Sequence, residues 1–191
     1  MSLLDILLLA VGLSMDAFAV AICKGLAIGS IRPRHAATVG AWFGFFQALM
    51  PTLGFLVGSV FARFVEAFAP WISFVLLALI GGNMVRESFG GDGDDTGASL
   101  GFRVMLAMAV ATSIDALAVG VSFAVDGMTL PSVLASSLLI GCVTFAISAA
   151  GVKIGSVFGT KYKNGAERVG GVILILLGIK ILLSGLGVLP F

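Results

Sequence analysis

Six apolar runs, each long enough to cross a lipid bilayer as a helix, constrain the fold more than any other feature of the sequence. About 20 consecutive apolar residues span the hydrocarbon core of a membrane. Hydrophobic residues make up 59% of the 191-residue chain and charged residues only 11%, against about 25% charged in an ordinary soluble domain. A water-soluble globule is therefore excluded, and we predict an all-α integral membrane protein with helices at residues 3–23, 38–60, 70–89, 104–125, 131–158 and 169–189.

The basic residues predict how these helices are oriented. Cytoplasmic loops of membrane proteins carry an excess of Lys and Arg. Arg63 alone serves the second and fourth loops, so we expect the first, third and fifth loops to face the cytoplasm and both termini to lie outside. The cations in or beside the odd-numbered loops are Lys24, Arg32, Arg34, Arg86, Arg103, Lys153, Lys161, Lys163 and Arg168.

The segment between the third and fourth runs differs from its surroundings in composition. Residues 90–99 read GGDGDDTGAS, and such Gly, Asp and Ser content cannot bury apolar surface. We predict a flexible cytoplasmic linker at 90–103 that joins a first unit, 1–89, to a second unit, 104–191. Alternatively, the three aspartates of this segment could collect cations at the entrance to a pathway.

Composition excludes several classes of function. The net charge of +1 and the lack of a Lys/Arg-rich run leave no electrostatic footprint for nucleic acid. A single His argues against a histidine metal cluster, and Cys23 and Cys142 lie in separate apolar runs without the spacing of a zinc site. We therefore expect no resident cofactor and no nucleic-acid partner, and the sequence makes no prediction of oligomeric state.

The two units repeat one another. Gly44, Gly54 and Gly58 recur 97 residues later as glycines, and Gln47 corresponds to Thr144. Each unit holds three spans, an odd number, so the second unit enters the membrane from the opposite side. We predict two inverted-topology three-helix repeats, an architecture typical of transporters. At a shift of 99, the sets that match are Ser14, Asp16, Ala17, Ala19 and Val20 with Ser113, Asp115, Ala116, Ala118 and Val119.

Small residues form stripes on the first helix of each repeat. Residues four apart lie on one helix face, and small side chains allow two helix backbones to approach closely in lipid. We expect the helices at 3–23 and 104–125 to pack against each other along these stripes. The stripe residues are Ala17, Ala21 and Gly25 on one helix, and Ala116, Gly120 and Ala124 on the other.

Asp16 and Asp115 are the main candidates for function. A carboxylate in the middle of a membrane span costs about 3 kcal/mol or more unless it meets a cation, a partner or water. Two carboxylates near the midplane would neutralise a divalent cation, whereas an empty, doubly ionised pair should take up protons, which couples metal release to protonation. Alternatively, either acid could form a buried ion pair with Lys180, which could also balance charge in the empty state or extend its ammonium to the interface.

Neutral oxygens near the two acids could complete a cation site. Hard divalent cations accept hydroxyl, amide and carbonyl oxygens as ligands, although a Ser or Thr hydroxyl in a helix often bonds back to its own backbone. Gln47 stands four residues before Pro51, which frees a backbone carbonyl in this turn; alternatively, Gln47 bridges two helices. The candidates are Ser14, Gln47, Asn83, Thr112, Ser113 and Thr144.

Four segments make the chain resemble the bacterial manganese efflux pumps of the MntP type, which are distantly related to the LysE-type exporters. This resemblance implies a six-helix protein of the inner membrane that exports Mn²⁺, with the positions of Asp16 and Asp115 essential. Some members carry glutamate where this chain has Gln47, so a third ionisable ligand is absent here. The segments are SMDAFAVAICKG at 14–25, GFFQALMPTLGFLVG at 44–58, GGNMVRE at 81–87 and TSIDALAVGV at 112–121.

The residues and the resemblance together predict a secondary transporter that exports Mn²⁺ and is coupled to protons. The ATP-binding pattern GxxxxGK[ST] is absent, so an ion gradient or the membrane potential should drive transport. We expect Asp16 and Asp115 to bind Mn²⁺ and carry protons, with Mn²⁺, H⁺ and the lipid bilayer as partners. The alternatives are an exporter of another divalent cation or of an amino acid, and an intramembrane enzyme of the aspartyl type; the inverted repeat argues against the enzyme.

Overall fold

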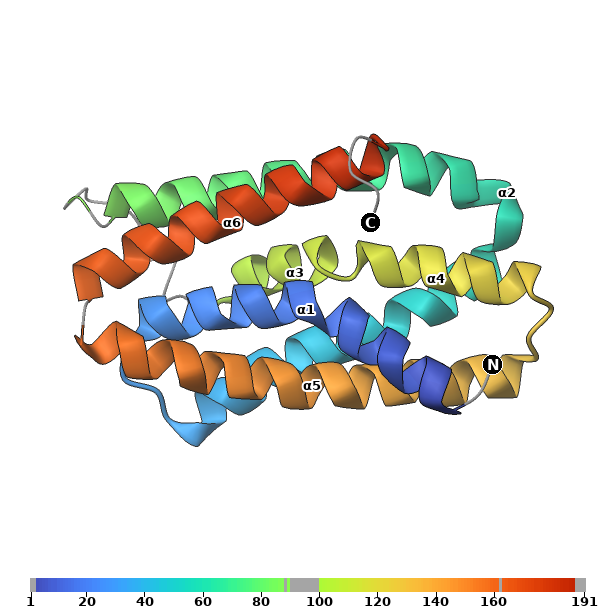
Figure 1. Cartoon of the computed structure of the whole chain (residues 1–191), viewed down its shortest axis with the longest axis horizontal. Helices are drawn as coiled ribbons and strands as arrows, with labels where there is room; N and C mark the ends of the chain where they lie inside the picture. The colour runs from blue at the N-terminus through green and yellow to red at the C-terminus, as the bar shows by residue number, and fades with distance from the viewer. Residues whose placement is uncertain (1–2, 88, 90–99, 162, 188–191) are drawn as a thin grey trace.

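The computed structural model describes residues 3–87, 89, 100–161 and 163–187, and all regular secondary structure within these ranges is helical. The helices run roughly along the long axis of the molecule and form one bundle (Figure 1). This confirms the all-α part of the prediction. The elements are α1 (Leu3–Ile28), α2 (Pro33–Glu87), α3 (Phe102–Ala111), α4 (Ile114–Val125), α5 (Leu130–Lys161) and α6 (Lys163–Gly185).

Among the residues that the structure describes, three helices are long and apolar enough to cross a membrane: Leu3–Ile28, Pro33–Gly58 and Leu130–Phe158. The bent pair of α3 and α4 supplies a fourth crossing if it counts as one span, and Pro70–Arg86 is a shorter apolar helix. The structure therefore supports a multi-pass membrane protein, and the count of six spans stays a prediction. The linker expected at 90–103 lies outside the described residues, except for 100–103.

α2 contains two of the predicted spans in one helical element. Its backbone leaves the helical conformation at Gly58, where φ is 63° and ψ is −166°. Only glycine adopts a positive φ of this kind readily, because a Cβ would clash with the backbone. The chain reverses direction along α2, so that its second half lies beside α6 (Figure 1). The loop that we expected between residues 60 and 70 is helical instead.

The predicted continuous helix at 104–125 is wrong, because the chain breaks into α3 and α4 at Thr112 and Ser113, with an angle of 48° between the two helices. Ser113 has φ −116° and ψ 8°, outside the helical range. Hydroxyl side chains compete with the backbone for helical hydrogen bonds, and the Thr112 hydroxyl donates to the Met108 carbonyl at 3.0 Å. Two adjacent hydroxyl residues thus coincide with a break that the run of apolar residues does not reveal.

Small residues do mediate close packing, but not between the helices that we predicted. The expected contact of α1 with α4 is wrong: within the described residues, α1 packs along α5 and α4 packs along α2. A Cβ at Gly25 would collide with the Val152 carbonyl of α5, and one at Gly120 with the Pro51 carbonyl of α2. The reason lies in the partner helices, which contribute glycines of their own and so permit a closer approach: Gly151 and Gly155 on α5, and Gly54 on α2.

These close contacts occur in equivalent pairs related by the sequence repeat. Gly54 of α2 abuts the Leu117 carbonyl of α4, and Gly151 of α5 meets the Phe18 carbonyl of α1. Gly151 follows Gly54 by 97 residues, and Leu117 follows Phe18 by 99, which are the two shifts of the repeat. The two halves of the chain therefore use corresponding residues to pack corresponding helices.

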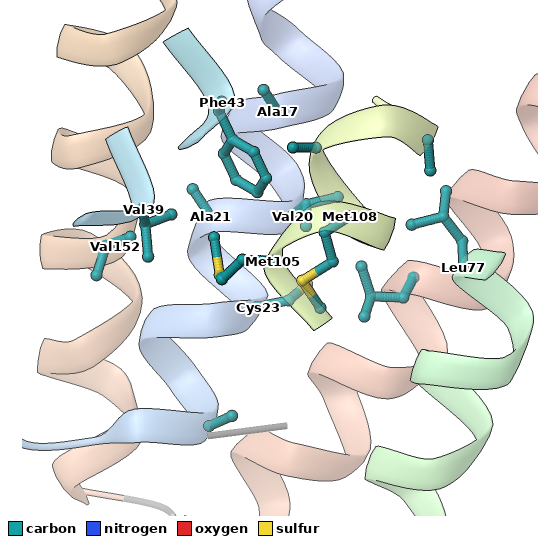
Figure 2. Packing of buried hydrophobic residues seen from close by; sticks show 14 of the residues in the cluster. Ala17, Val20, Ala21, Cys23, Val39, Phe43, Leu77, Met105, Met108 and Val152 are labelled. Carbon is teal, nitrogen blue, oxygen red and sulfur yellow. The ribbon is translucent and has the colours of Figure 1, made fainter. Parts of the chain in front are cut away.

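Two clusters of buried apolar side chains lie at different levels of the bundle. The larger, which we call the α3-side cluster, joins Met105 and Met108 of α3 to residues of α1, α2, α5 and α6 (Figure 2). α1 contributes Ala17 to this cluster and Leu13 to the smaller one, so the boundary between them falls within about one helical turn. The smaller, the α4-side cluster, consists of Ala10, Leu13, Ala116 and Ile140.

Substitution of Gly141 by Ala should destabilise the contact between α5 and α2. The added methyl group would lie 2.7 Å from the Gly44 carbonyl oxygen and 2.8 Å from the Ala48 Cβ, so the two backbones must separate. We expect a loss of about 1–3 kcal/mol in unfolding free energy, measured as a lower thermal unfolding temperature in detergent. The matched control is Gly82→Ala, because a Cβ at Gly82 meets nothing within 4 Å. Equal unfolding temperatures for the two variants would contradict this packing.

Candidate functional site

Polar side chains occupy the boundary between the two apolar clusters. On α1, Ser14 and Asp16 lie between Leu13 of the α4-side cluster and Ala17 of the α3-side cluster. Polar residues mark the same boundary on α2, on α5 and at the break between α3 and α4. The structure therefore brings most of the predicted site residues to one level of the bundle. We call these residues the polar layer: Ser14, Asp16, Gln47, Thr112, Ser113, Asp115 and Thr144.

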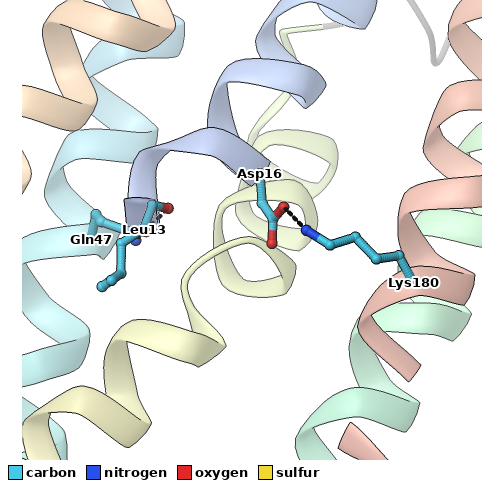
Figure 3. Close-up of polar contacts among 4 residues, drawn as sticks. All are labelled: Leu13, Asp16, Gln47 and Lys180. Carbon is cyan, nitrogen blue, oxygen red and sulfur yellow. Dashed lines mark hydrogen bonds and ion pairs between the residues drawn. The ribbon is translucent and has the colours of Figure 1, made fainter. Parts of the chain in front are cut away.

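Asp16 forms an ion pair with Lys180. The Lys180 Nζ lies 3.4 Å from the Asp16 Oδ1, and the lysine side chain extends from α6 toward α1 to reach it (Figure 3). The Asp16 side chain is 19% exposed and that of Lys180 is 55% exposed. Of the alternatives that the sequence left open, an ion pair with Lys180 is thus present for Asp16.

Asp115 is the second residue of α4 and lies in its first turn, just after the helix break. Its Oδ1 accepts a hydrogen bond from the Ala116 N–H at 2.8 Å. The residue is exposed, in contrast to the half-buried Asp16. Asp115 also lies close enough to Asp16 and Lys180 for both of their charges to act on its carboxylate. Two carboxylates and one ammonium therefore share the region where α1, α4 and α6 meet the polar layer.

Ser14 and Thr144 join α1 to α5 through their hydroxyls. The Ser14 Oγ lies 2.8 Å from the Thr144 Oγ1 and also 2.6 Å from the Ala10 carbonyl, to which it donates. The hydroxyl donated to Ala10 is the back-bonded arrangement expected of a helical serine. Both residues are fully buried, so their hydrogen bonds are not open to competition from bulk water.

Gln47 bridges α2 and α1, as one of the alternatives for this residue predicted. Its Nε2 donates to the Leu13 carbonyl at 3.1 Å (Figure 3). The Gln47 Oε1 and the Ser113 Oγ, however, are buried and have no hydrogen-bond partner within the described residues. An unpaired buried oxygen costs about 1–3 kcal/mol, which makes these two atoms candidates for binding a cation.

Asn83 is the predicted site residue that the structure does not bring to the polar layer. Its neighbours on α2, Gly81 and Met84, pack against Gly171 and Gly170 of α6. Those glycines lie about two and a half helical turns from Lys180 along α6, so Asn83 is level with the α3-side cluster. Its distance from the other candidates separates it from the site in this conformation.

Two features of the region were missed from the sequence. Ser148 is buried one helical turn after Thr144, and its hydroxyl has no partner within the described residues. Its spacing of four from Thr144 was the available signal. Lys24, which we counted with the first loop, is instead fully buried within α1, and its position directly after Cys23 at the end of the apolar run gave no sign of this.

The chemistry of the polar layer suits a hard cation. Within the described residues, no group of three or more His, Cys, Asp or Glu side chains gathers to form a closed metal centre. The donors present are two carboxylates supplemented by hydroxyl and amide oxygens, a set that binds Mn²⁺, Mg²⁺ or Ca²⁺ rather than soft metals.

Comparisons with known proteins identify the family. A family model described as "Putative manganese efflux pump" matches residues 30–182. A relative of that name from Acetivibrio thermocellus is 49% identical over 195 aligned positions, covering 100% of this chain and 96% of the relative. Another from Bifidobacterium adolescentis is 50% identical over 189 positions, covering 98% and 99% respectively. No solved structure matches the chain significantly. With its sequence matched from end to end, the chain belongs to the MntP family of manganese efflux pumps.

Proposed function

We propose that this protein exports Mn²⁺ across the bacterial inner membrane, with Asp16 and Asp115 as its charged ligands. The observation that carries the proposal is the polar layer, which places two carboxylates between two apolar clusters in a chain of the manganese efflux family. Ionised groups at such a level of a membrane protein are costly and commonly mark an ion pathway. Membership of the family selects Mn²⁺ among the hard cations that these oxygens would bind.

The proposed architecture is six membrane spans in two inverted three-helix repeats, 1–89 and 104–191, with the odd-numbered loops in the cytoplasm and both termini outside. Its support is the equivalence of the close contacts, in which Gly54 and Gly151 meet corresponding carbonyls. Helix breaks in transporters place backbone and side-chain oxygens at the substrate site, and the break at Thr112 and Ser113 lies directly before Asp115. Alternating access then proceeds by motion of one repeat against the other.

Neutral oxygens complete the proposed ligand set. Gln47 and Ser113 each present a buried oxygen without a partner within the described residues, and coordination of a cation would satisfy both atoms. Ser14 and Thr144 occupy the equivalent positions of the repeat but bond to each other, so they would bind only after that hydrogen bond opens. Asn83 is left out of the set because it packs at the level of the α3-side cluster.

Proton coupling follows from the charges of the proposed site. Two carboxylates without a metal ion repel each other, and protonation relieves this repulsion. Metal binding requires their ionised forms, so Mn²⁺ and protons compete for the same oxygens. Entry of protons from outside would thus release Mn²⁺ to the outside, which is the direction required for export.

Asp16→Asn and Asp115→Asn should each abolish Mn²⁺ export, because each removes one of the two charges that balance the ion. We expect transport into inside-out vesicles to fall at least about tenfold, the loss that follows from removal of a charged ligand. The matched control is Asp126→Asn, an exposed acid at the end of α4, which should transport like the wild type. Mn²⁺ export by a well-inserted Asp16→Asn protein would refute the assignment.

An imposed pH gradient should drive Mn²⁺ movement in proteoliposomes. With the compartment that receives Mn²⁺ made acidic, we expect faster accumulation than at equal pH, and reversal of the gradient should slow it. Parallel assays with Mg²⁺ and Zn²⁺ determine the selectivity. Identical rates of Mn²⁺ accumulation with and without the gradient would refute proton coupling but would not contradict the metal site.

The pair Ser14–Thr144 and its repeat equivalent Ser113–Gln47 should close in alternation during the transport cycle. The first pair is hydrogen bonded and the second has two unpaired oxygens, as expected of one end state of a pseudo-symmetric cycle. In a background with Cys23 and Cys142 replaced by Ala, we would introduce Ser14→Cys with Thr144→Cys, or Ser113→Cys with Gln47→Cys. Both pairs should cross-link, each locking transport. Failure of the second pair to cross-link, with or without Mn²⁺, would refute the alternation.

A further inference from the structure

The contact between Lys180 and Asp16 joins two helices through opposite charges. Lys180 lies on α6, Asp16 lies on α1, and the 3.4 Å between Nζ and Oδ1 is spanned by the extended lysine side chain (Figure 3). An ammonium within a membrane span costs about 3 kcal/mol when it has no partner. Each group therefore neutralises the other in this conformation.

This lysine has no counterpart in the other half of the chain. Under the shift of 97 that relates Gly81 to Gly178, the residue equivalent to Lys180 is Asn83, which is neutral. The aspartates, in contrast, occur in both halves. Packing of the first repeat thus does not require a lysine at this position, and the positive charge is specific to the second repeat.

We propose that the Lys180 ammonium is the resident counter-ion of Asp16 and that a divalent cation displaces it when it binds. This inference rests on the proposed function. With the lysine in place, two carboxylates and one ammonium sum to −1; with the lysine withdrawn, a divalent ion between the carboxylates brings the sum to zero. A monovalent ion would only replace one positive charge by another. Lys180 is therefore a specificity-determining residue that favours divalent over monovalent cations.

The side chain of Lys180 can make this exchange. Its ammonium is carried on a flexible four-carbon stem, and 55% of the side chain is already exposed. Withdrawal from Asp16 therefore needs rotation about side-chain bonds and no unpacking of α6. When the metal leaves, the same ammonium returns to Asp16, which keeps the empty protein from holding two uncompensated carboxylates.

The test compares Lys180→Met, which removes the charge, with Lys180→Arg, which keeps it. Binding is measured on the purified full-length protein in detergent, by titration with MnCl₂ and detection of free Mn²⁺ by electron paramagnetic resonance. We expect Lys180→Met to bind Mn²⁺ about two- to fivefold more tightly than the wild type, the range for loss of a competing, partly exposed ion pair. Lys180→Arg should not tighten binding, and Lys153→Met, an exposed lysine on α5, serves as the matched control.

Competition by sodium distinguishes a cation that occupies the position of the Lys180 ammonium from general electrostatic screening by salt. In Lys180→Met the vacated position accepts a monovalent ion, so NaCl should weaken Mn²⁺ binding more than choline chloride at equal ionic strength. In the wild type the two salts should act alike. Export by Lys180→Met in proteoliposomes should be slower than that of the wild type, because no ammonium returns to expel the ion. A purely structural role would instead weaken binding and transport together.

The outcomes separate this inference from the proposed function. Wild-type protein that binds no Mn²⁺ overturns both. Wild-type binding combined with an unchanged or weaker affinity of Lys180→Met overturns the counter-ion alone, provided that thermal unfolding shows a folded variant. Lys180→Gln is the second uncharged variant and takes the place of Lys180→Met if the latter does not fold; it must show the same tightening and the same sodium competition.

Discussion

The cost of placing charge in an apolar interior governs how this molecule is built. Inside a bilayer, each ionised group needs an opposite charge, a polar partner or water, and each polar backbone group needs a hydrogen bond. Seven polar residues of this kind form the polar layer, between two clusters of apolar side chains. Here Asp16 has a lysine, Ser14 has a threonine, and the Gln47 amide nitrogen has a backbone carbonyl. The groups left without such partners are those that a substrate ion could satisfy.

Glycine packing makes this concentration of polar groups feasible. Where Gly25 meets α5 and Gly120 meets α2, the helix backbones approach so closely that a single methyl group would not fit. Close approach of this kind excludes lipid and water from the helix interfaces. It also places Ser14 within hydrogen-bonding distance of Thr144 across the boundary between α1 and α5. The small residues therefore act on the site indirectly, by setting the separation of the helices that carry it.

The all-helical class could be predicted from the sequence, because it depends on local composition. Apolar runs predict helices wherever they occur, and the duplicated motif picked out Asp16 and Asp115 without any structure. Neither the break between α3 and α4 nor the packing of α1 along α5 was predicted from the sequence. Helix pairing depends on which glycine faces meet in three dimensions, and the break depends on hydroxyl groups competing with backbone hydrogen bonds. Neither effect leaves a periodic signal in one chain. For the same reason, the sequence left the contact of Lys180 with Asp16 as one of several alternatives.

The two halves of the chain pack in similar ways but carry different charges. These two properties have different consequences. Corresponding glycine contacts give the two halves similar packing, so the opening of either side should involve similar helix motions. The charges do not follow this symmetry, since the second repeat carries Lys180 where the first carries Asn83, and Gln47 stands where the second repeat has Thr144. A symmetric site would favour neither side of the membrane when empty. An ammonium held against Asp16 alone stabilises one conformation of the empty protein over the other, because the ion pair joins only α6 to α1. Under the proposed mechanism, the ion gradients set the direction of transport, the side chains that break the repeat set which side the empty protein prefers to face, and the residues shared by the two halves supply the proposed site.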